Sequence, residues 1–129
     1  MSVYDEYGME YNVVELLHEG YHLIQITGKL RDTDAHKLHE DILEVADRLP
    51  EGRFLVDIRH LEERLNVFET MGVAHSVLKG VIGKIRKVAI LDDITNRTSA
   101  IIAETVMAGR GLQVNFFFDE AMAIEWLLA

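Results

Sequence analysis

The chain has 129 residues, of which 49% are hydrophobic and 27% charged, with a formal net charge of −9 and no cysteine. Its length suits one domain with a single hydrophobic core. The negative charge argues against nucleic acids and anionic membrane surfaces as partners, because both attract basic proteins. The lack of cysteine excludes disulfides, thiolate metal sites and thiol nucleophiles.

The first ten residues are polar and acidic and have no clear periodicity, which predicts a loosely ordered arm. This beginning has none of the features of a signal peptide, and no apolar run approaches the roughly 20 residues needed to span a bilayer. We therefore expect a cytoplasmic protein without a membrane span.

Local patterns predict a hairpin, a helix and a buried strand in the first half of the chain. Two stretches rich in β-formers, 12–17 and 21–27, are separated by a short segment that ends at Gly20, as in an antiparallel hairpin. Residues 34–49 repeat apolar side chains at spacings of three and four, which predicts an amphipathic helix. The run 54–58 is mostly apolar on both faces, as in a strand between two layers of helices.

The second half continues this alternation of helices and strands. A charged connection, 61–65, leads to a second helix that begins near Asn66. The later elements that we expect are a buried strand at 86–91, a helix from Thr95 or Asn96 to Ala108, a strand at 112–118 and a short helix capped by Asp119. In the third helix the side chains expected to face inward are those of Ile101, Ile102, Thr105 and Val106.

The expected order of elements is thus ββαβαβαβα. Strands that alternate with helices run parallel and are joined by right-handed crossovers. We therefore predict an α/β fold in which residues 1–129 form one domain. An N-terminal antiparallel hairpin and parallel strands would form a mixed sheet of about five strands, with helices packed on it.

Several core and turn segments carry a resemblance to a known family. They are Ile26-Thr27-Gly28-Lys29-Leu30 with Asp34, Phe54-Leu55-Val56-Asp57-Ile58, Lys87-Val88-Ala89-Ile90-Leu91-Asp92, and Phe117-Phe118-Asp119-Glu120-Ala121 with Glu125-Trp126-Leu127. Together these segments span the chain from Tyr21 nearly to its end, and their order and spacing carry the resemblance. The sequence resembles the STAS superfamily, in its SpoIIAA-like (STAS/SEC14-like) branch. This resemblance implies a small cytoplasmic module, often dimeric, used in binding or regulation more than in catalysis.

One functional feature of that superfamily is missing here. Its anti-sigma-factor antagonists carry a phosphorylatable serine where a helix follows the central strand. The corresponding stretch of this chain, 57–70, contains no serine. We therefore assign no phosphorylation site.

The ends of the two buried strands carry the candidate ligand or partner site. Asp57, Arg59 and His60 follow one strand, and Asp92 and Asp93 follow the next. Open α/β sheets usually bind ligands at this edge, and a carboxylate can orient a histidine for acid–base chemistry. The alternative is that these groups form structural ion pairs and helix caps. No nucleophile, metal set or oxyanion motif accompanies them, so the sequence favours this alternative over catalysis.

The second predicted helix is apolar over a broad arc. Such an arc can contact a protein partner, bind an apolar ligand or pack in the hydrophobic core. Its candidate interface or pocket residues are Phe68, Met71, His75, Leu78 and Ile82.

These patterns leave three hypotheses for the function. The first is a non-enzymatic binding or regulatory module, homodimeric, that acts through protein–protein contact. The second is a carrier of a small apolar or lipid-like ligand held between the second helix, the third helix and the sheet. The third is an enzyme that uses Asp57, His60 and Asp92. We expect no cofactor and no metal site.

Overall fold

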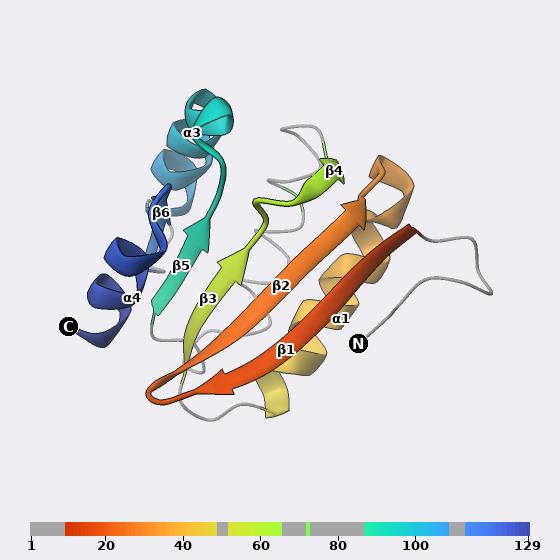
Figure 1. Cartoon of the computed structure of the whole chain (residues 1–129). Coiled ribbons are helices and arrows are strands. Elements are labelled where there is room, and N and C mark those ends of the chain that lie inside the picture. Colours follow the sequence, from red (N-terminus) through yellow and green to blue (C-terminus); the bar gives the residue numbers. More distant parts are fainter. Residues whose placement is uncertain (1–9, 49–51, 66–71, 73–86, 109–112) are drawn as a thin grey trace.

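The structure of the protein is a computed structural model that describes residues 10–48, 52–65, 72, 87–108 and 113–129, and Figure 1 shows its ribbon. In these ranges the elements follow the order β1, β2, α1, β3, β4, β5, α3, β6 and α4. The described strands form one mixed sheet of six strands. The predicted α/β class is therefore confirmed.

The N-terminal hairpin consists of β1 (Glu10–His18) and β2 (Tyr21–Lys29). The two strands pair antiparallel without interruption, from Glu10 opposite Lys29 to His18 opposite Tyr21. The hairpin is thus confirmed, and each strand is longer than the sequence predicts. At the turn Gly20 has a φ of +86°, a conformation that favours glycine over residues with a Cβ.

Gly20→Ala should lower the free energy of unfolding by about 1–2 kcal/mol, chiefly because alanine is strained at this backbone angle. A Cβ at this position would also lie 2.8 Å from Cδ2 of Leu128. That methyl group ends a flexible side chain that is 45% exposed, so it can move aside at little cost. Urea denaturation followed by circular dichroism measures the change.

Gly72→Ala is the matched control. Gly72 lies in a helical conformation and is exposed, and a Cβ there would have no heavy atom within 4 Å apart from its chain neighbours and the nearby backbone of its own helix. Alanine in a helix is favoured over glycine by about 1 kcal/mol, so this variant should keep or gain stability. Equal losses for the two glycines would contradict the assignment of strain to the hairpin turn.

The amphipathic helix α1 (Ala35–Arg48) follows a short 3-10 turn, η1 (Asp32–Asp34). The carboxylate of Asp34 accepts a hydrogen bond from the backbone N–H of Arg31 at 2.9 Å, which helps to start the helix. Leu38 and Val45 on its apolar side are buried against the sheet. The helix predicted at 34–49 is confirmed over Ala35–Arg48, and residue 49 lies outside the described residues.

Three further strands of the sheet run parallel to β2. They are β3 (Arg53–Asp57), β5 (Lys87–Leu91) and β6 (Val114–Phe117), and the sheet order is β1-β2-β3-β5-β6. In β3 and β5 the register places Asp57 beside Leu91. The carboxyl ends of these two strands therefore meet at the same edge of the sheet.

A further short strand, β4 (Leu61–Glu63), pairs parallel with the end of β2. This corrects the prediction of a charged connection at 61–65. The register of β3 with β2 stops at Gln25, so the last residues of β2 would otherwise lack a neighbour on that side. The segment after β3 supplies one, and the N–H of Leu30 donates to the carbonyl of Glu63 at 2.9 Å.

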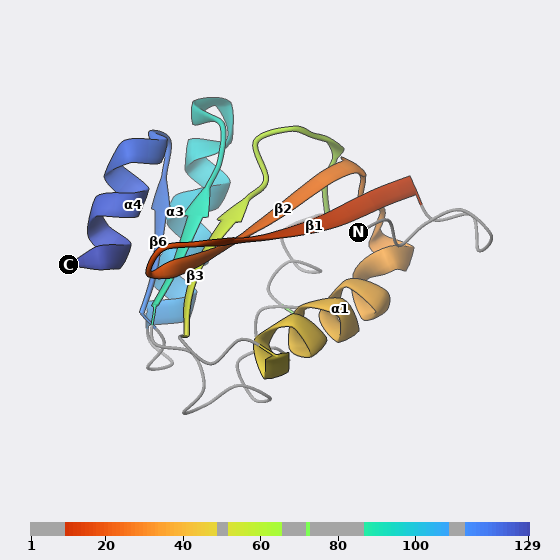
Figure 2. The ribbon, with the colours of Figure 1, turned by 60° about the horizontal axis from the view of Figure 1, so that its bottom comes forward.

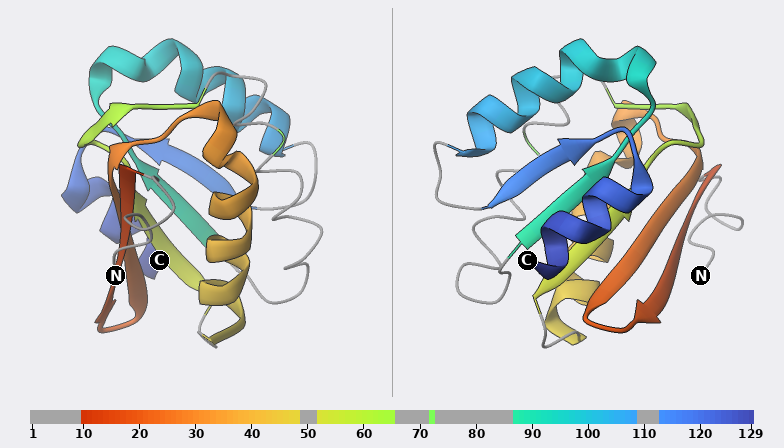
Figure 3. Two further views of the ribbon diagram at one scale, coloured as in Figure 1. Left: turned by 90° about the vertical axis from the view of Figure 1, so that its right-hand side faces the viewer. Right: turned by 60° about the vertical axis from the view of Figure 1, so that its left-hand side comes forward.

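Helices cover the two faces of the sheet (Figures 2 and 3). Helix α1 packs on one face, where Val13, Ile26 and Phe54 are buried. Helix α4 (Glu120–Leu128) lies on the opposite face, where Leu55 and Leu127 are fully buried. The carboxylate of Asp119 accepts from the N–H of Met122 at 3.0 Å, which confirms the predicted cap. The central strand β3 is thus buried from both sides, as its apolar sequence predicts.

Helix α3 (Arg97–Ala108) follows a 3-10 turn, η2 (Ile94–Asn96), and its orientation differs from the prediction. Its buried side chains are Ala100 and Ala103, whereas Ile101 and Ile102 are 58% and 45% exposed.

Thr105 also points outward, and its hydroxyl donates to the carbonyl of Ile101 at 2.9 Å. A second contact helps to fix the helix, because a carboxylate oxygen of Glu104 accepts from the backbone N–H of Phe116 in β6. The side chain of Val106 lies outside the described residues. Among the described helices, none is long and apolar enough to cross a membrane.

Candidate functional site

The candidate site lies where β3 and β5 end. Asp57 is the last residue of β3, and Asp92 comes directly after β5. Their exposed fractions are only 3% and 2%. A buried carboxylate is costly unless it is paired and hydrogen-bonded, so the partners of these two groups decide what the site can do.

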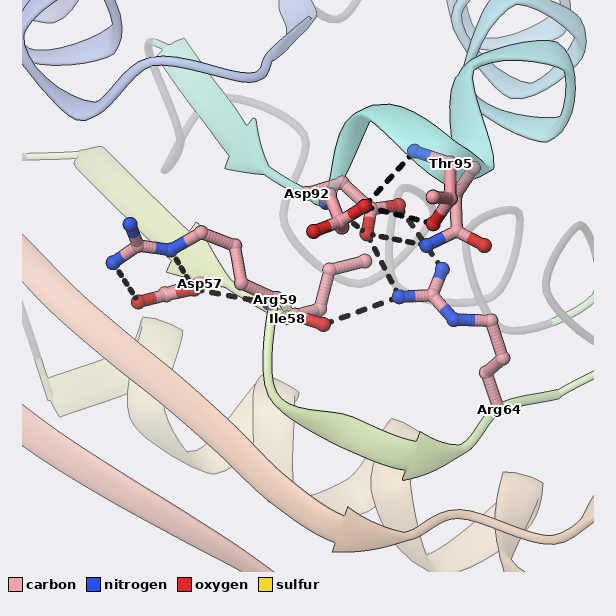
Figure 4. Close-up of polar contacts among 8 residues, drawn as sticks. Asp57, Ile58, Arg59, Arg64, Asp92 and Thr95 are labelled. Atoms are coloured by element: carbon pink, nitrogen blue, oxygen red, sulfur yellow. Dashed lines mark hydrogen bonds and ion pairs between the residues drawn. The ribbon is translucent and has the colours of Figure 1, made fainter.

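Asp57 is held by Arg59 of its own strand end (Figure 4). Nε of Arg59 donates to Oδ1 at 3.0 Å and Nη2 donates to Oδ2 at 2.9 Å. The backbone N–H of Arg59 adds a third bond to Oδ1 at 3.0 Å. Burial raises the pKa of Asp57, but the hydrogen bonds and charge of Arg59 outweigh it and hold the pKa below its ordinary value.

Asp92 is held by an arginine from a different part of the chain. Nη2 of Arg64, which follows β4, donates to Oδ1 of Asp92 at 2.7 Å, and Nη1 donates to Oδ2 at 3.0 Å. Nη2 also donates to the carbonyl of Ile58 at 3.1 Å. Figure 4 shows this guanidinium beside Asp92 and the carbonyl of Ile58. Arg64 thereby ties the segment after β3 to the end of β5.

The remaining bonds of this region begin the next helix. Oδ1 of Asp92 also accepts from the N–H of Asp93 at 2.7 Å and from Nδ2 of Asn96 at 3.2 Å. Oδ1 of Asp93 accepts from the N–H and the hydroxyl of Thr95, at 2.9 and 2.7 Å. These two bonds lower the pKa of Asp93. The first cap of the helical segment is thus Asp93, ahead of the predicted Thr95 or Asn96.

The predicted site residues are therefore brought together only in part. His60 is exposed, and the hydrogen bonds within the described part of the chain join it to neither Asp57 nor Asp92. Both buried carboxylates already accept from a guanidinium on each oxygen. The arrangement suits structural ion pairs better than proton transfer. Among the described residues, no group of three or more His, Asp or Glu side chains is placed to hold a metal ion.

Arg64 is the residue of this site that the sequence does not reveal. It occurs in a charged run, Glu62-Glu63-Arg64, whose side chains are expected to be solvated. The available signal was indirect, because two aspartates at buried strand ends call for nearby cations. The second predicted set, Phe68, Met71, His75, Leu78 and Ile82, lies outside the described residues.

Comparison with known proteins identifies the family of this fold. A family model described as SpoIIAA-like matches residues 22–128. A solved structure from Shewanella loihica PV-4, an uncharacterized protein of the DUF3478 family with a SpoIIAA-like fold, is similar with a TM-score of 0.55 and 20% sequence identity. The match covers 92% of this chain and 94% of that one. No curated protein matches. The chain, as its core and turn segments suggest, belongs to the SpoIIAA-like family.

Proposed function

We propose that this chain is a non-enzymatic binding or regulatory module of the cytoplasm that acts through contact with other proteins. The observation that carries the proposal is the exposed surface of η2 and α3. Ile94, Ile101 and Ile102 are 56%, 58% and 45% exposed there. Exposed apolar side chains that cluster on one surface, rather than singly, are typical of interaction sites.

The three isoleucines belong to two consecutive elements. Ile101 and Ile102 are neighbours on the outward side of α3, and Ile94 lies in the 3-10 turn η2 that leads directly into this helix. Thr98 and Thr105 fall on the same side and are exposed as well. We call these five residues the α3 face. It carries no charge, although the chain as a whole has a net charge of −9. The depletion of charge suits the centre of a protein–protein interface.

The polar site at the ends of β3 and β5 supports a binding role over an enzymatic one. Asp57 and Asp92 are each held by an arginine, and His60 is bonded to neither within the described residues. Proton transfer by these groups would first require a buried ion pair to break, which is costly. Asp92 also helps to fix the start of the neighbouring η2 and α3, because its Oδ1 accepts a hydrogen bond from Nδ2 of Asn96.

Replacing Ile101 and Ile102 together by lysine should weaken binding to a protein partner strongly while the fold is retained. Both side chains are largely exposed, and lysine is a good helix former, so stability should change by less than about 0.5 kcal/mol. At an interface, the loss of one buried apolar anchor costs about 1–2 kcal/mol, so the loss of two should weaken binding by about 30- to 1,000-fold. Crosslinking in native cells followed by mass spectrometry, then titration of the purified partner, measures the loss.

The matched control is Met122→Lys with Leu128→Lys on α4. These side chains are 61% and 45% exposed, so the control adds the same charge to a different apolar surface. The partner should still bind it with wild-type affinity. Equal loss of binding in both variants, or equal retention, would contradict a role for the α3 face.

A carrier of a small apolar or lipid-like ligand is the second candidate function. The exposed isoleucines of α3 support it in a modified form, in which the ligand lies against the outer side of this helix and not between the helix and the sheet. Native mass spectrometry of freshly purified protein should then show an added mass of a few hundred daltons, which Ile101→Lys with Ile102→Lys removes. A single unliganded mass, with no fluorescence gain from hydrophobic dyes, would reject the carrier hypothesis. It would leave the protein-binding proposal in place.

The proposal also includes a homodimer, in which a second copy of this chain is one of the protein partners. The net charge of −9 opposes close approach of two copies through charged surfaces. Apolar or main-chain contacts are therefore better suited to join them. Its test is the molar mass in solution.

A further inference from the structure

We propose that the free edge of β1 is the surface where two copies of this chain meet, with β1 of one copy paired antiparallel to β1 of the other. This inference rests on the homodimer proposed above and assigns the surface and geometry of its contact. It is separate from the α3 face, which lies near the opposite end of the sheet order.

In the described part of the chain, strand β1 is a long edge with little of the usual protection. It has nine residues and forms one edge of the sheet, where it pairs with β2 alone within the described residues. Natural edge strands discourage pairing with lysine, proline, a bulge or short length. The sequence of β1, EYNVVELLH, contains no lysine, arginine or proline, and its register with β2 is continuous. The main-chain groups of such an edge can accept a further strand.

The opposite edge of the sheet is protected in a way that β1 is not. Strand β6 has only four residues. The backbone N–H of Phe116 in that strand already donates to Oε2 of Glu104 at 2.7 Å. A side chain from α3 thus occupies a main-chain donor that a new strand would need. The contrast identifies β1 as the edge where pairing is available.

The side chains of β1 suit an uncharged contact. Leu16 and Leu17 near its end are 50% and 72% exposed. The carboxylate of Glu15 is neutralised within the copy by Nη2 of Arg48, at 2.6 Å. The repulsion expected between two acidic chains is therefore reduced along this edge.

A second copy of β1 is the partner that we assign to this edge, because the exposed Leu16 and Leu17 and the neutralised Glu15 would then lie on both sides of the contact. Antiparallel pairing about Val14 places Val14 opposite its own copy and uses all nine residues. Odd residues then face odd residues and even residues face even ones, so the face covered by α1 in one copy continues as the same face in the other.

Leu16→Lys with Leu17→Lys should dissociate the dimer. Lysine on an edge strand is a natural block to pairing, and both side chains are exposed enough to be replaced without unfolding the monomer. We expect dimerisation to weaken at least about 100-fold by sedimentation equilibrium. Ile101→Lys with Ile102→Lys adds the same charge to the α3 face and should leave the dimer intact.

Single cysteines test the register, because the natural chain has none. Opposite residues of an antiparallel pair have Cα atoms about 4.5–5.5 Å apart, within the range of a disulfide. Val14→Cys should therefore form a disulfide-linked dimer on mild oxidation. Asn12→Cys should not, since the two copies of residue 12 would be about 14 Å apart along the strands.

Each outcome bears on a different statement. A monomer at micromolar concentration would overturn both the homodimer and the β1 contact, and would leave the α3 face to its own test. A dimer that survives Leu16→Lys with Leu17→Lys and is not linked through Val14→Cys would keep the homodimer and overturn the β1 contact. Equal linkage through Val14→Cys and Asn12→Cys would overturn the register about Val14.

Discussion

Arg64→Met should lower the free energy of unfolding by about 3–5 kcal/mol, the usual cost of removing one partner from a buried ion pair. The change leaves the carboxylate of Asp92, only 2% exposed, without the two guanidinium bonds at 2.7 and 3.0 Å. The carbonyl of Ile58 loses its donor from Arg64 at the same time. Methionine keeps much of the length and apolar character of the arginine stem, so the loss reports mainly on the charge.

Two further variants identify the cause of that loss. Asp92→Asn removes the buried charge, so the double variant Arg64→Met with Asp92→Asn should be more stable than Arg64→Met alone. Arg97→Met is the matched control. Arg97 is exposed, and the described residues show no ion pair for it, so this change should cost less than about 0.5 kcal/mol. A cost below about 1 kcal/mol for Arg64→Met would contradict a structural role for the pair.

Hydrogen exchange locates the effect within the fold. Arg64 follows β4, and the N–H of Leu30 donates to the carbonyl of Glu63 just before it. If Arg64 holds β4 beside the end of β2, the amide of Leu30 should exchange faster in Arg64→Met. Amides in the middle of the hairpin, such as that of Val14, should lose protection only by the amount that the lower free energy of global unfolding explains.

The elements that the sequence predicts well are those fixed by local patterns. The hairpin follows from two β-rich runs around Gly20, and α1 follows from an apolar stripe of one helix face. Strand β4 has no such pattern, since two of its three residues are glutamates. It forms because the end of β2 needs main-chain partners, a requirement that appears only when β2 and β3 are placed side by side.

The ion pairs of the candidate site also differ in how well the sequence predicts them, according to how far apart the two partners are in the chain. Asp57 and Arg59 are two residues apart, so their contact could be weighed from the sequence. Arg64 and Asp92 are 28 residues apart, and only the sheet order brings them together.

The orientation of α3 was predicted wrongly because hydropathy points to Ile101 and Ile102 as the buried side chains. Its contact with the rest of the fold uses Ala100 and Ala103 instead. Small side chains let a helix approach closely, and the bond from Phe116 to Glu104 helps to set its rotation. The isoleucines that this rotation exposes are the basis of the proposed α3 face.

Asp57→Asn should lower the free energy of unfolding at pH 7 by about 2–3 kcal/mol, the range for hydrogen bonds that involve a charged group. The amide that replaces the carboxylate has nearly the same shape but removes the charge opposite Arg59. It also places an N–H₂ group against the guanidinium donors, which now reach Oδ1 and Oδ2 at 3.0 and 2.9 Å. Since Asp57 is 3% exposed, water replaces little of what is lost.

The pH dependence of this loss identifies the ionised carboxylate as its cause. The pKa of Asp57 in the folded protein lies below its ordinary value of 3.8, because the bonds and charge of Arg59 outweigh the effect of burial. A carboxylate with a lowered folded pKa supplies stability that is complete above its unfolded pKa and is lost as the pH falls through the folded value. The wild type and Asp57→Asn should therefore differ fully above about pH 5 and converge as the pH falls below the ordinary pKa of 3.8. Urea titrations across this range measure the difference, with Glu125→Gln, an exposed carboxylate, as the control that stays close to wild type throughout. A difference that is independent of pH would assign the loss to packing of the amide, and the charge of Asp57 would then have no part in holding the end of β3.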